Sequence, residues 1–214
     1  MSPSQSCPSS PRTTSTSRPS RPVSVAVTGG IGAGKSELLH AFERQGAAVV
    51  SSDDIVHTLL RQDPDVKRAV VERFGEEVLG PDGEIDRSAV ARIVFSSRRQ
   101  LKWLEELLHP LVVATYLRWR EQLAELDEPP EVCITEVPLL YEVGGETRFD
   151  TVVAVTASPD VRASRKVLAT DRRGSRLIPD DEKLRRADFA YVNEGTLDEL
   201  DSFVGEVLDA ILRR

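Results

Sequence analysis

One stretch near the start of the chain limits the choice of fold more than any other. It is Gly29-Gly30-Ile31-Gly32-Ala33-Gly34-Lys35-Ser36, and it directly follows an apolar run at residues 23–28. A glycine, four residues and then Gly-Lys-Ser, placed between a short strand and a helix, is the pattern of a loop that binds phosphate groups. Glycines leave room for phosphate oxygens against the main chain, and the following helix directs its positive end at them. The stretch therefore predicts a phosphate-binding loop within an α/β fold.

Within this loop the side chains have separate expected roles. The Lys35 ammonium reaches the outer phosphates, and the Ser36 hydroxyl can ligate Mg²⁺. A glycine-rich turn without a ligand is the alternative, but strand, spacing, Lys-Ser and helix all agree on the first interpretation. The residues predicted to bind the phosphates of a nucleotide are Gly30, Ile31, Gly32, Ala33, Gly34, Lys35 and Ser36.

Composition excludes several other classes of protein. The formal net charge is −7, and residues 1–22 hold three arginines and no acid, so the remainder carries −10. Nucleic acids are bound by basic surfaces, so a nucleic acid is not the expected partner. No apolar run reaches about 18 residues, the length that would span a membrane, so no membrane span is expected.

The first 22 residues differ in composition from the rest. They are rich in Ser, Pro, Thr and Arg and lack an apolar centre, so we expect a disordered tail, with a transit peptide as the alternative. Residues 23–214 are expected to form a single domain. Cys7 falls in the tail and Cys133 in a buried-looking strand, which argues against a disulfide and favours a reducing cytoplasm. The pattern does not set the oligomeric state, although we favour a monomer.

Strands and helices alternate along most of the chain. Apolar runs predict five strands, at residues 23–28, 47–50, 131–137, 151–156 and 189–192. Such alternation indicates a parallel sheet with right-handed crossovers, which binds ligands at the carboxyl ends of its strands. From residue 63 to about 126 the pattern is helical almost throughout, with helices predicted at 64–74, 87–95 and 98–126. We interpret this stretch as an inserted helical subdomain that forms a pocket for a second substrate.

Carboxylates follow two of the predicted strands. Asp53 comes after the second strand and is the candidate general base, because we place it one strand away from the loop, where an acceptor hydroxyl would face the terminal phosphate. Capping of the helix predicted at 55–61 is the alternative role for Asp53 or Asp54. Glu136 ends the third strand, where a carboxylate can hold the water shell of Mg²⁺, and a plain strand end is its alternative. The predicted metal ligands are Ser36 and Glu136.

The remaining motifs indicate which phosphate chemistry to expect. The Asn-Lys-x-Asp motif that reads guanine is missing, and so is the Leu-Ser-Gly-Gly-Gln signature of transporter ATPases. The chain has instead a helical insertion, Asp53, and an arginine-rich segment at about 165–182 that we interpret as a short lid. Spacing leaves open which arginine of this segment reaches the nucleotide, and a solvated position is the alternative for each; Arg165 and Arg173 are our catalytic candidates. These parts predict phosphoryl transfer from a nucleotide to a small molecule.

Several short motifs in a fixed order resemble those of the dephospho-CoA kinase family. Residues 28–36 are similar to the family's phosphate loop, Thr-Gly-Gly-Ile-Gly-Ser-Gly-Lys-Ser. Ser51-Ser52-Asp53 is similar to its Asp-Ala-Asp, and His109-Pro110 to its His-Pro. Pro138-Leu139-Leu140-Tyr141-Glu142 resembles its Pro-Leu-Leu-Phe-Glu. The His-Pro and Pro-Leu-Leu motifs are far more specific than the loop.

Further matches lie near the end of the chain. Glu182-Lys183, Ala187-Asp188 and Asn193-Glu194-Gly195 are similar to the family's Glu-Lys, Ala-Asp and Asn-x-Gly. The resemblance therefore covers roughly residues 23–212. It implies a P-loop NTPase-like parallel sheet flanked by helices, with an inserted helical substrate subdomain and a short lid.

The resemblance also implies an activity and a set of site residues. The activity is ATP-dependent phosphorylation of the ribose 3′-hydroxyl of dephospho-CoA, the last step of coenzyme A synthesis, with ATP as phosphoryl donor and Mg²⁺. Lys35 and Ser36 are implied to hold the ATP phosphates and Mg²⁺, and Asp53 is the family's proposed base. The residues implied on the acceptor side are His109, Pro138, Leu139 and Glu142. Those implied near the adenine are Asn193 and Gly195.

The chain departs from the family pattern at several positions. Ser51 stands where the family has the first Asp of Asp-Ala-Asp, and Glu136 replaces the usual Asp before Pro-Leu-Leu. In the lid, the family's Arg-Leu-x-x-Arg is reduced to Arg165-Lys166, and Leu177 replaces a Gln. We expect slow activity or an altered donor preference as a result. Another small-molecule kinase with the same loop and a non-catalytic nucleotide-binding regulator are the alternative functions.

Overall fold

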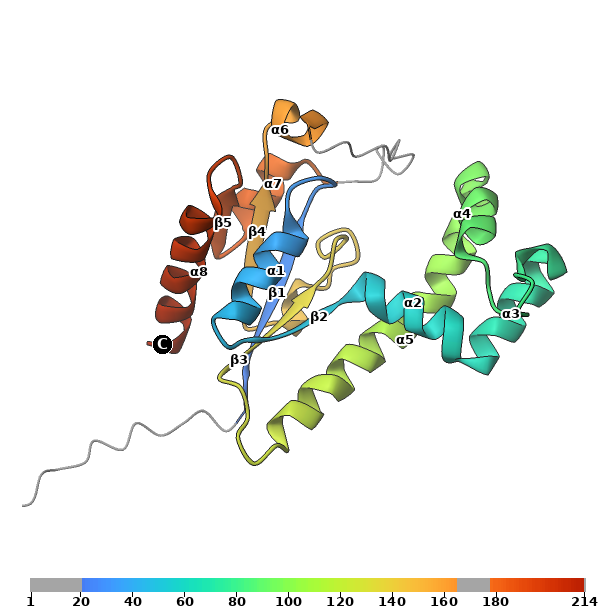
Figure 1. The fold of residues 1–214 in the computed structure, drawn as a ribbon, viewed down its shortest axis with the longest axis horizontal. Helices are drawn as coiled ribbons and strands as arrows, with labels where there is room; N and C mark the ends of the chain where they lie inside the picture. Colours follow the sequence, from blue (N-terminus) through green and yellow to red (C-terminus); the bar gives the residue numbers. More distant parts are fainter. Residues whose placement is uncertain (1–20, 165–177, 214) are drawn as a thin grey trace, which may run out of the picture.

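Strands and helices alternate along the chain, as the pattern predicts (Figure 1). The structure, a computed structural model, describes residues 21–164 and 178–213. Its elements are β1 (Val23–Gly29), α1 (Lys35–Arg44), β2 (Ala48–Ser51), α2 (Ser52–Gln62), α3 (Pro64–Phe74), η1 (Glu76–Val78), α4 (Arg87–Ser96), α5 (Arg98–Ala124), β3 (Val132–Glu136), η2 (Glu146–Arg148), β4 (Thr151–Thr156), α6 (Pro159–Ser164), α7 (Asp180–Arg186), β5 (Phe189–Val192) and α8 (Leu197–Leu212).

The five strands form one parallel sheet in the order β2-β3-β1-β4-β5. This confirms the predicted parallel sheet, but one detail of the prediction is wrong. Strand β3 lies between β1 and β2, so Asp53 is two strands away from the phosphate loop and not one. Glu136, at the end of β3, is in register with Val27 of β1 on one side and with Ser51 of β2 on the other. The sheet order therefore places Glu136 between the phosphate loop and the start of α2.

Alternating side chains of the strands build a core on each face of the sheet. On one face, Val25 and Val27 belong to an apolar cluster that also contains Phe42 of α1 and Val204 of α8. On the other face, Ala26 belongs to a second cluster with Leu140, Tyr141 and Val152, against which Ala187 packs just after α7. A sheet covered on both faces explains why the strands read as nearly continuous apolar runs.

Helices α2 to α5 form a part of the molecule that stands away from the sheet, beyond its β2 edge (Figure 1). Its own apolar core is made by Leu60 of α2, Val70 of α3, Val90 of α4 and Leu108 of α5, with further buried neighbours. The rings of Phe74 and Trp103 meet edge to face in this core, with centroids 5.2 Å apart. A smaller cluster around Ile55, Val112 and Tyr116 joins α2 and α5 to the sheet.

Two helices differ from what the sequence pattern predicts, one in where it begins and one in not being predicted at all. Helix α2 begins at Ser52 and not at residue 55, because the Ser51 hydroxyl caps it by accepting a hydrogen bond from the Asp53 N–H. Helix α7 was not predicted, since it has a charged sequence in which Lys183 is the buried member. Its support is polar: the Asp181 carboxylate accepts from Arg185 one turn later, at 2.8 Å. Apolar periodicity cannot reveal such a helix.

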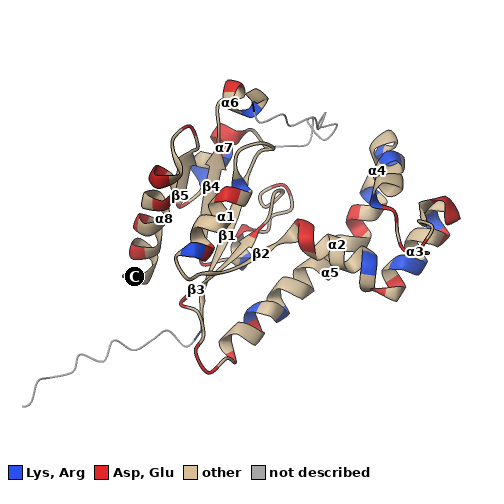
Figure 2. Cartoon of the chain, in the orientation of Figure 1, with Lys and Arg blue, Asp and Glu red and all other residues tan. Residues whose placement is uncertain are grey.

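Charge is distributed unevenly over the helices (Figure 2). Helix α8 carries only acidic charged residues, whereas α5 carries more basic than acidic residues. The negative net charge is thus concentrated on α8, at the far end of the sheet from α2 to α5. Among the described residues, no helix is both long enough and apolar enough to cross a membrane.

Candidate active site

The phosphate loop connects β1 to α1 in the predicted conformation. Gly32 and Gly34 have φ values of 74° and 94°, a region that other residues rarely adopt, which explains the glycines there. Helix α1 begins at Lys35, directly after Gly34, so its first N–H groups face the loop. The Lys35 ammonium donates to the Gly30 carbonyl at 3.1 Å and so folds back over the loop. This geometry is that of a cradle for phosphate groups.

Lys35 and Glu136 form a loose pair beside the loop. The Lys35 Nζ lies 3.8 Å from the Glu136 Oε1, and the two side chains are 12% and 9% exposed. Burial lowers the pKa of Lys35 and raises the pKa of Glu136, while the opposite charge of each partner acts against its shift. Burial is the larger effect on both, so the opposite charge of the partner only partly offsets the cost of burying each charge.

The two departures of the chain from the family pattern at Ser51 and Glu136 are in direct contact. The Ser51 hydroxyl donates to the Glu136 Oε2 at 2.8 Å, which lowers the pKa of Glu136 against the effect of burial. Ser51 accepts from the Asp53 N–H with the same oxygen. The longer Glu136 side chain thus reaches a partner on β2. In the family pattern both positions carry an Asp, whereas this chain has one carboxylate, Glu136, facing the Ser51 hydroxyl.

Asp53 has an exposed carboxylate on the first turn of α2. Because the Ser51 side chain is the cap of this helix, capping does not account for the Asp53 side chain. Lys35 and Glu136 are both close enough for the charge of Asp53 to act on their titration. Asp53 also lines a large cavity, whereas Asp54 does not.

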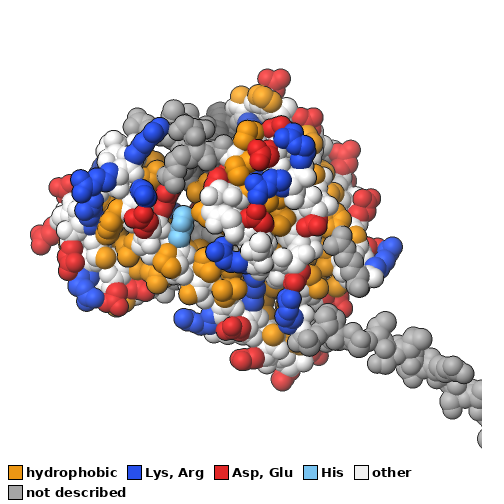
Figure 3. Space-filling model, turned by 180° about the vertical axis from the view of Figure 1, so that it is seen from behind, with side chains coloured by type: hydrophobic (Ala, Val, Ile, Leu, Met, Phe, Trp, Pro, Cys, Tyr) orange, Lys and Arg blue, Asp and Glu red, His pale blue; other side chains and the backbone are white. Residues whose placement is uncertain are grey.

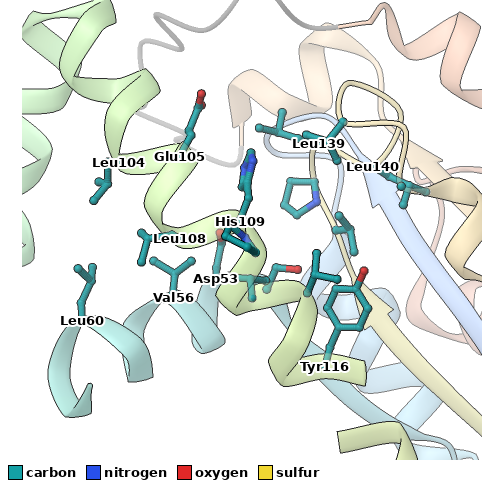
Figure 4. Close-up of a pocket in the computed structure, with 18 of the residues that line it drawn as sticks. Asp53, Val56, Leu60, Leu104, Glu105, Leu108, His109, Tyr116, Leu139 and Leu140 are labelled. Carbon is teal, nitrogen blue, oxygen red and sulfur yellow. The ribbon is translucent and has the colours of Figure 1, made fainter. Parts of the chain in front are cut away.

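That cavity has a volume of about 800 Å³ and lies between α2, α4, α5 and the loop after β3. In Figure 4, Asp53 and His109 point into it from α2 and α5, and Leu139 lies across from them on the loop after β3. Leu60, Leu104 and Leu108 add apolar side chains to its lining. Seen from behind, hydrophobic side chains gather beside a histidine between the helical part and the sheet (Figure 3). A cavity of this size and lining fits a substrate with an extended apolar portion.

The cavity also brings together residues that the sequence did not single out. Arg87, the first residue of α4, lines it, and its guanidinium lies 3.0 Å from the His57 Nδ1. Arg148 lines it from the other side. With His109 they provide basic groups in a lining that is mostly apolar and also holds the carboxylates of Asp53 and Glu105. Arg87 follows the capping residue Asp86, and that cap was the signal that could have drawn attention to it.

Of the predicted acceptor-side residues, Pro138 and Leu139 line the cavity, but Glu142 does not. The Glu142 carboxylate is buried behind the cavity wall, 2.7 Å from the Lys183 Nζ. It also accepts from the Ile178 N–H at 3.1 Å. The Pro138 carbonyl accepts from Lys183 at 3.4 Å. Glu142 and Lys183 thus hold the loop that carries Pro138 and Leu139.

The predicted adenine-side residues lie at the end of β5. Asn193 is buried and donates from Nδ2 to the Ala33 carbonyl at 3.1 Å, which ties the end of β5 to the phosphate loop. Gly195 is exposed, and a Cβ there would collide with the Glu199 side chain that caps α8. Arg165 and Arg173 lie outside the described residues, as does most of the predicted lid.

Ser36 and Glu136 offer oxygen donors, which Mg²⁺ prefers. Ser36 is exposed on the first turn of α1, and the buried Glu136 carboxylate lies beside Lys35. Within residues 21–164 and 178–213, no group of three or more His, Cys, Asp or Glu side chains is arranged to hold a metal. Magnesium commonly takes one or two protein ligands and completes its shell with water and substrate phosphates, so the donor set fits this ion.

Comparison with known proteins identifies the family. A family model described as dephospho-CoA kinase matches residues 23–199, which include all five strands and the helices between them. The chain belongs to the dephospho-CoA kinase family. A dephospho-CoA kinase of Protochlamydia amoebophila is 37% identical over 190 residues, which cover 86% of this chain and 93% of the relative. One of Corynebacterium glutamicum is 32% identical over 197 residues, which cover 89% and 98%.

Solved structures agree with the fold. A crystal structure of a Thermus thermophilus protein superposes with a TM-score of 0.71 at 30% identity, over 89% of this chain and 98% of that one. The dephospho-CoA kinase from Campylobacter jejuni superposes with a TM-score of 0.64 at 24% identity, over 88% and 96%. Both cover the helical part as well as the sheet. The P-loop kinase fold implied by the family resemblance is therefore confirmed.

Proposed function

We propose that this chain transfers the γ-phosphoryl group of ATP to the ribose 3′-hydroxyl of dephospho-CoA, giving CoA and ADP, the last step of coenzyme A synthesis. The observation that carries the proposal, beside family membership, is the position of Asp53. Its carboxylate lines the acceptor cavity and also acts electrostatically on Lys35 of the phosphate loop. A phosphoryl donor on the loop and an acceptor hydroxyl in the cavity would then both lie beside the Asp53 carboxylate.

On the donor side, residues 30–36 would hold the ATP phosphates. The Lys35 ammonium, kept over the loop by the Gly30 carbonyl, is free to turn to a phosphate oxygen and to stabilise the charge that develops on the transferring group. Asn193 supports this role by holding the loop from β5, and we propose that it and Gly195 lie beside the adenine.

On the acceptor side, the 3′-hydroxyl oxygen attacks the γ-phosphorus and its proton passes to the Asp53 carboxylate. One P–O bond forms, the bond between the β,γ-bridging oxygen and the γ-phosphorus breaks, and ADP leaves with that electron pair. General-base assistance of this kind contributes about 10²- to 10⁴-fold. His109, Pro138 and Leu139 position the acceptor along the cavity, with Glu142 fixing the loop from behind.

Ser36 and Glu136 are the residues that would hold Mg²⁺, the hydroxyl directly and the carboxylate through bound water. When bound, Mg²⁺ neutralises charge on the donor phosphates. Arg165 and Arg173 remain our proposed lid arginines. A cytoplasmic monomer is our proposal for the working form, and Cys133 supports a reducing compartment as a buried free thiol whose pKa is raised by burial.

The test is a direct assay of the reaction. Purified protein with ATP, Mg²⁺ and dephospho-CoA is expected to form CoA and ADP, detected by mass, with the new phosphate on the 3′-oxygen. Folded protein that binds ATP but forms no CoA would disprove the proposal. Shikimate or a pyrimidine nucleoside in place of dephospho-CoA tests the alternative of another small-molecule kinase.

Asp53→Asn separates catalysis from binding, and Asp54→Asn is its matched control. Both lie on the first turn of α2 and both are exposed, but only Asp53 lines the cavity. We expect Asp53→Asn to lower kcat about 10²-fold or more with dephospho-CoA still bound. Asp54→Asn is expected to keep kcat near that of the wild type. Equal activity of the two variants would favour a regulator that binds ATP without using Asp53.

A further inference from the structure

An ion pair lies directly on the phosphate loop, at its side opposite to Glu136. Arg162 of α6 pairs with Asp180, the first residue of α7. A Cβ built on Gly30 would lie 2.8 Å from the Asp180 Oδ2 and 3.1 Å from the Arg162 Nη1. Both charged groups therefore touch the backbone of the loop at Gly30, and the absence of a side chain there makes room for them.

The guanidinium of Arg162 is held firmly in this place. Its Nε donates to the Ala157 carbonyl at 2.7 Å, and its Nη2 donates to the Thr156 hydroxyl at 2.6 Å. The Thr156 hydroxyl donates in turn to the Asp180 Oδ2 at 3.1 Å. Thr156 ends β4, the strand next to β1, so the arrangement is fixed at the carboxyl edge of the sheet.

The position of Asp180 is unusual for a carboxylate. It is near enough to Lys35 for its charge to act on that ammonium, and it lies at a loop whose conformation favours anions. A nucleoside triphosphate on the loop brings several negative charges to the same place. Asp180 and the terminal phosphates therefore compete for the Arg162 guanidinium, because a guanidinium forms paired hydrogen bonds with phosphates as well as with carboxylates.

We propose that Arg162 is a further ligand of the donor phosphates, and that Asp180 occupies its guanidinium until the triphosphate displaces it. The inference rests on the proposed function only in that the loop binds a nucleoside triphosphate. It assigns a phosphate contact to the last turn of α6, three residues before Arg165. Because Asp180 must give up its partner when the donor binds, it weakens donor binding in proportion to its charge.

The first test compares Asp180→Asn with Asp181→Asn by calorimetric titration. Asp181 is the next residue, is exposed and pairs with Arg185 away from the loop, so it is the matched control. We expect Asp180→Asn to bind ATP and inorganic tripolyphosphate about fivefold more tightly, with adenosine unchanged, because only the phosphates meet the carboxylate. Asp181→Asn is expected to bind all three as the wild type does.

The second test compares Arg162→Gln with Arg185→Gln. We expect Arg162→Gln to weaken ATP and tripolyphosphate binding about tenfold and to lower kcat/KM for ATP, with the KM for dephospho-CoA unchanged. Arg162→Lys should restore part of the loss, because it returns the charge without the planar fork. Arg185→Gln is expected to have no effect on nucleotide binding.

Several outcomes would overturn the inference. Weaker or unchanged ATP binding by Asp180→Asn would mean that the carboxylate does not compete, and Arg162→Gln equal to the wild type would remove the phosphate contact. Thermal unfolding without ligand checks that the variants fold, and Asp180→Ser replaces Asp180→Asn if that variant does not. If the wild type binds ATP and the variants behave as expected but no CoA forms, the proposed function fails and this inference stands.

Discussion

Two largely buried Lys–Glu pairs lie at the carboxyl edge of the same sheet, and they differ in the distance between the lysine nitrogen and the carboxylate. The Lys35 Nζ is 3.8 Å from Glu136, and the lysine side chain is 12% exposed. The Lys183 Nζ is 2.7 Å from Glu142, and that lysine side chain is 4% exposed. The first pair stands at the phosphate loop, and the second stands behind the loop that forms one wall of the acceptor cavity.

The difference follows from the other partners of each group. Lys183 also donates to the Pro138 carbonyl, and the Glu142 Oε1 also accepts from the Ile178 N–H, so both groups hold parts of the chain together. Lys35 has the Gly30 carbonyl and a distant carboxylate, and it keeps donors for a ligand. The closed pair is expected to serve stability and the loose pair to serve binding.

The largest expected effect is on stability, at the closed pair. Lys183→Met leaves the Glu142 carboxylate buried without its cation, and breaking a buried pair in this way costs about 3–5 kcal/mol. We expect the free energy of unfolding, measured in urea, to fall by that amount. Adding Glu142→Gln removes the stranded charge and should recover part of the loss. A loss under about 1 kcal/mol for the single variant would contradict the assignment.

At the loose pair, the expected effect is on catalysis. Lys35→Met should lower kcat by about 10²- to 10³-fold, or about 2.7–4 kcal/mol of barrier, because it removes a donor to the transferring phosphoryl group. Stability at pH 7 should change far less than in Lys183→Met, because Lys35 lies 3.8 Å from its carboxylate and the Ser51 hydroxyl still donates to Glu136 in the variant. Steady-state assays of CoA formation and urea unfolding measure the two effects. Equal destabilisation by both variants would erase the contrast between the pairs.

The sequence pattern locates the phosphate loop between its strand and helix because the parts of this motif are local. The phosphate loop, its strand and the first turn of α1 are adjacent in the chain, and the glycines and Lys-Ser carry the signal themselves. The His-Pro and Pro-Leu-Leu motifs added the acceptor side through their resemblance to a family. His109, Pro138 and Leu139 do line one cavity, although they come from elements far apart in the chain.

What the sequence did not reveal depends on how distant elements pack. No local pattern states that β3 inserts between β1 and β2, and that order decides that Glu136 faces both Lys35 and Ser51. The pairing of Glu142 with Lys183 and that of Arg162 with Asp180 each join segments on different elements. Polar contacts of this kind leave no periodicity in the sequence, so only the folded chain shows them.

A smaller effect is expected at Ser51, which connects the loose pair to α2. Ser51→Ala removes the hydrogen bond to Glu136, worth about 1 kcal/mol, and the cap of α2, worth about 1 kcal/mol as well. The two terms separate in a double-mutant cycle, because in the Glu136→Met background, which has no acceptor for the Ser51 hydroxyl, only the loss of the cap should remain. Urea unfolding of the four proteins gives the coupling. Zero coupling would mean that Ser51 acts on α2 alone.

The smallest expected effect is the pH dependence that Lys35 gives to stability. Burial lowers its pKa in the folded protein below the ordinary value of 10.5. As the pH falls below 10.5, the unfolded chain takes up the proton before the folded chain does, so protonation favours unfolding. The buried Lys35 therefore costs no stability above pH 10.5; the cost grows as the pH falls from 10.5 and is fully present below the folded-state pKa of Lys35.

The measurement is the free energy of unfolding in urea of the wild type minus that of Lys35→Met, in which the effects of other groups cancel. This difference should rise from pH 8 to pH 11. A difference that stays flat over this range would mean that the ammonium is not desolvated, and the loose pair would then be no better prepared for a phosphate than a lysine in water.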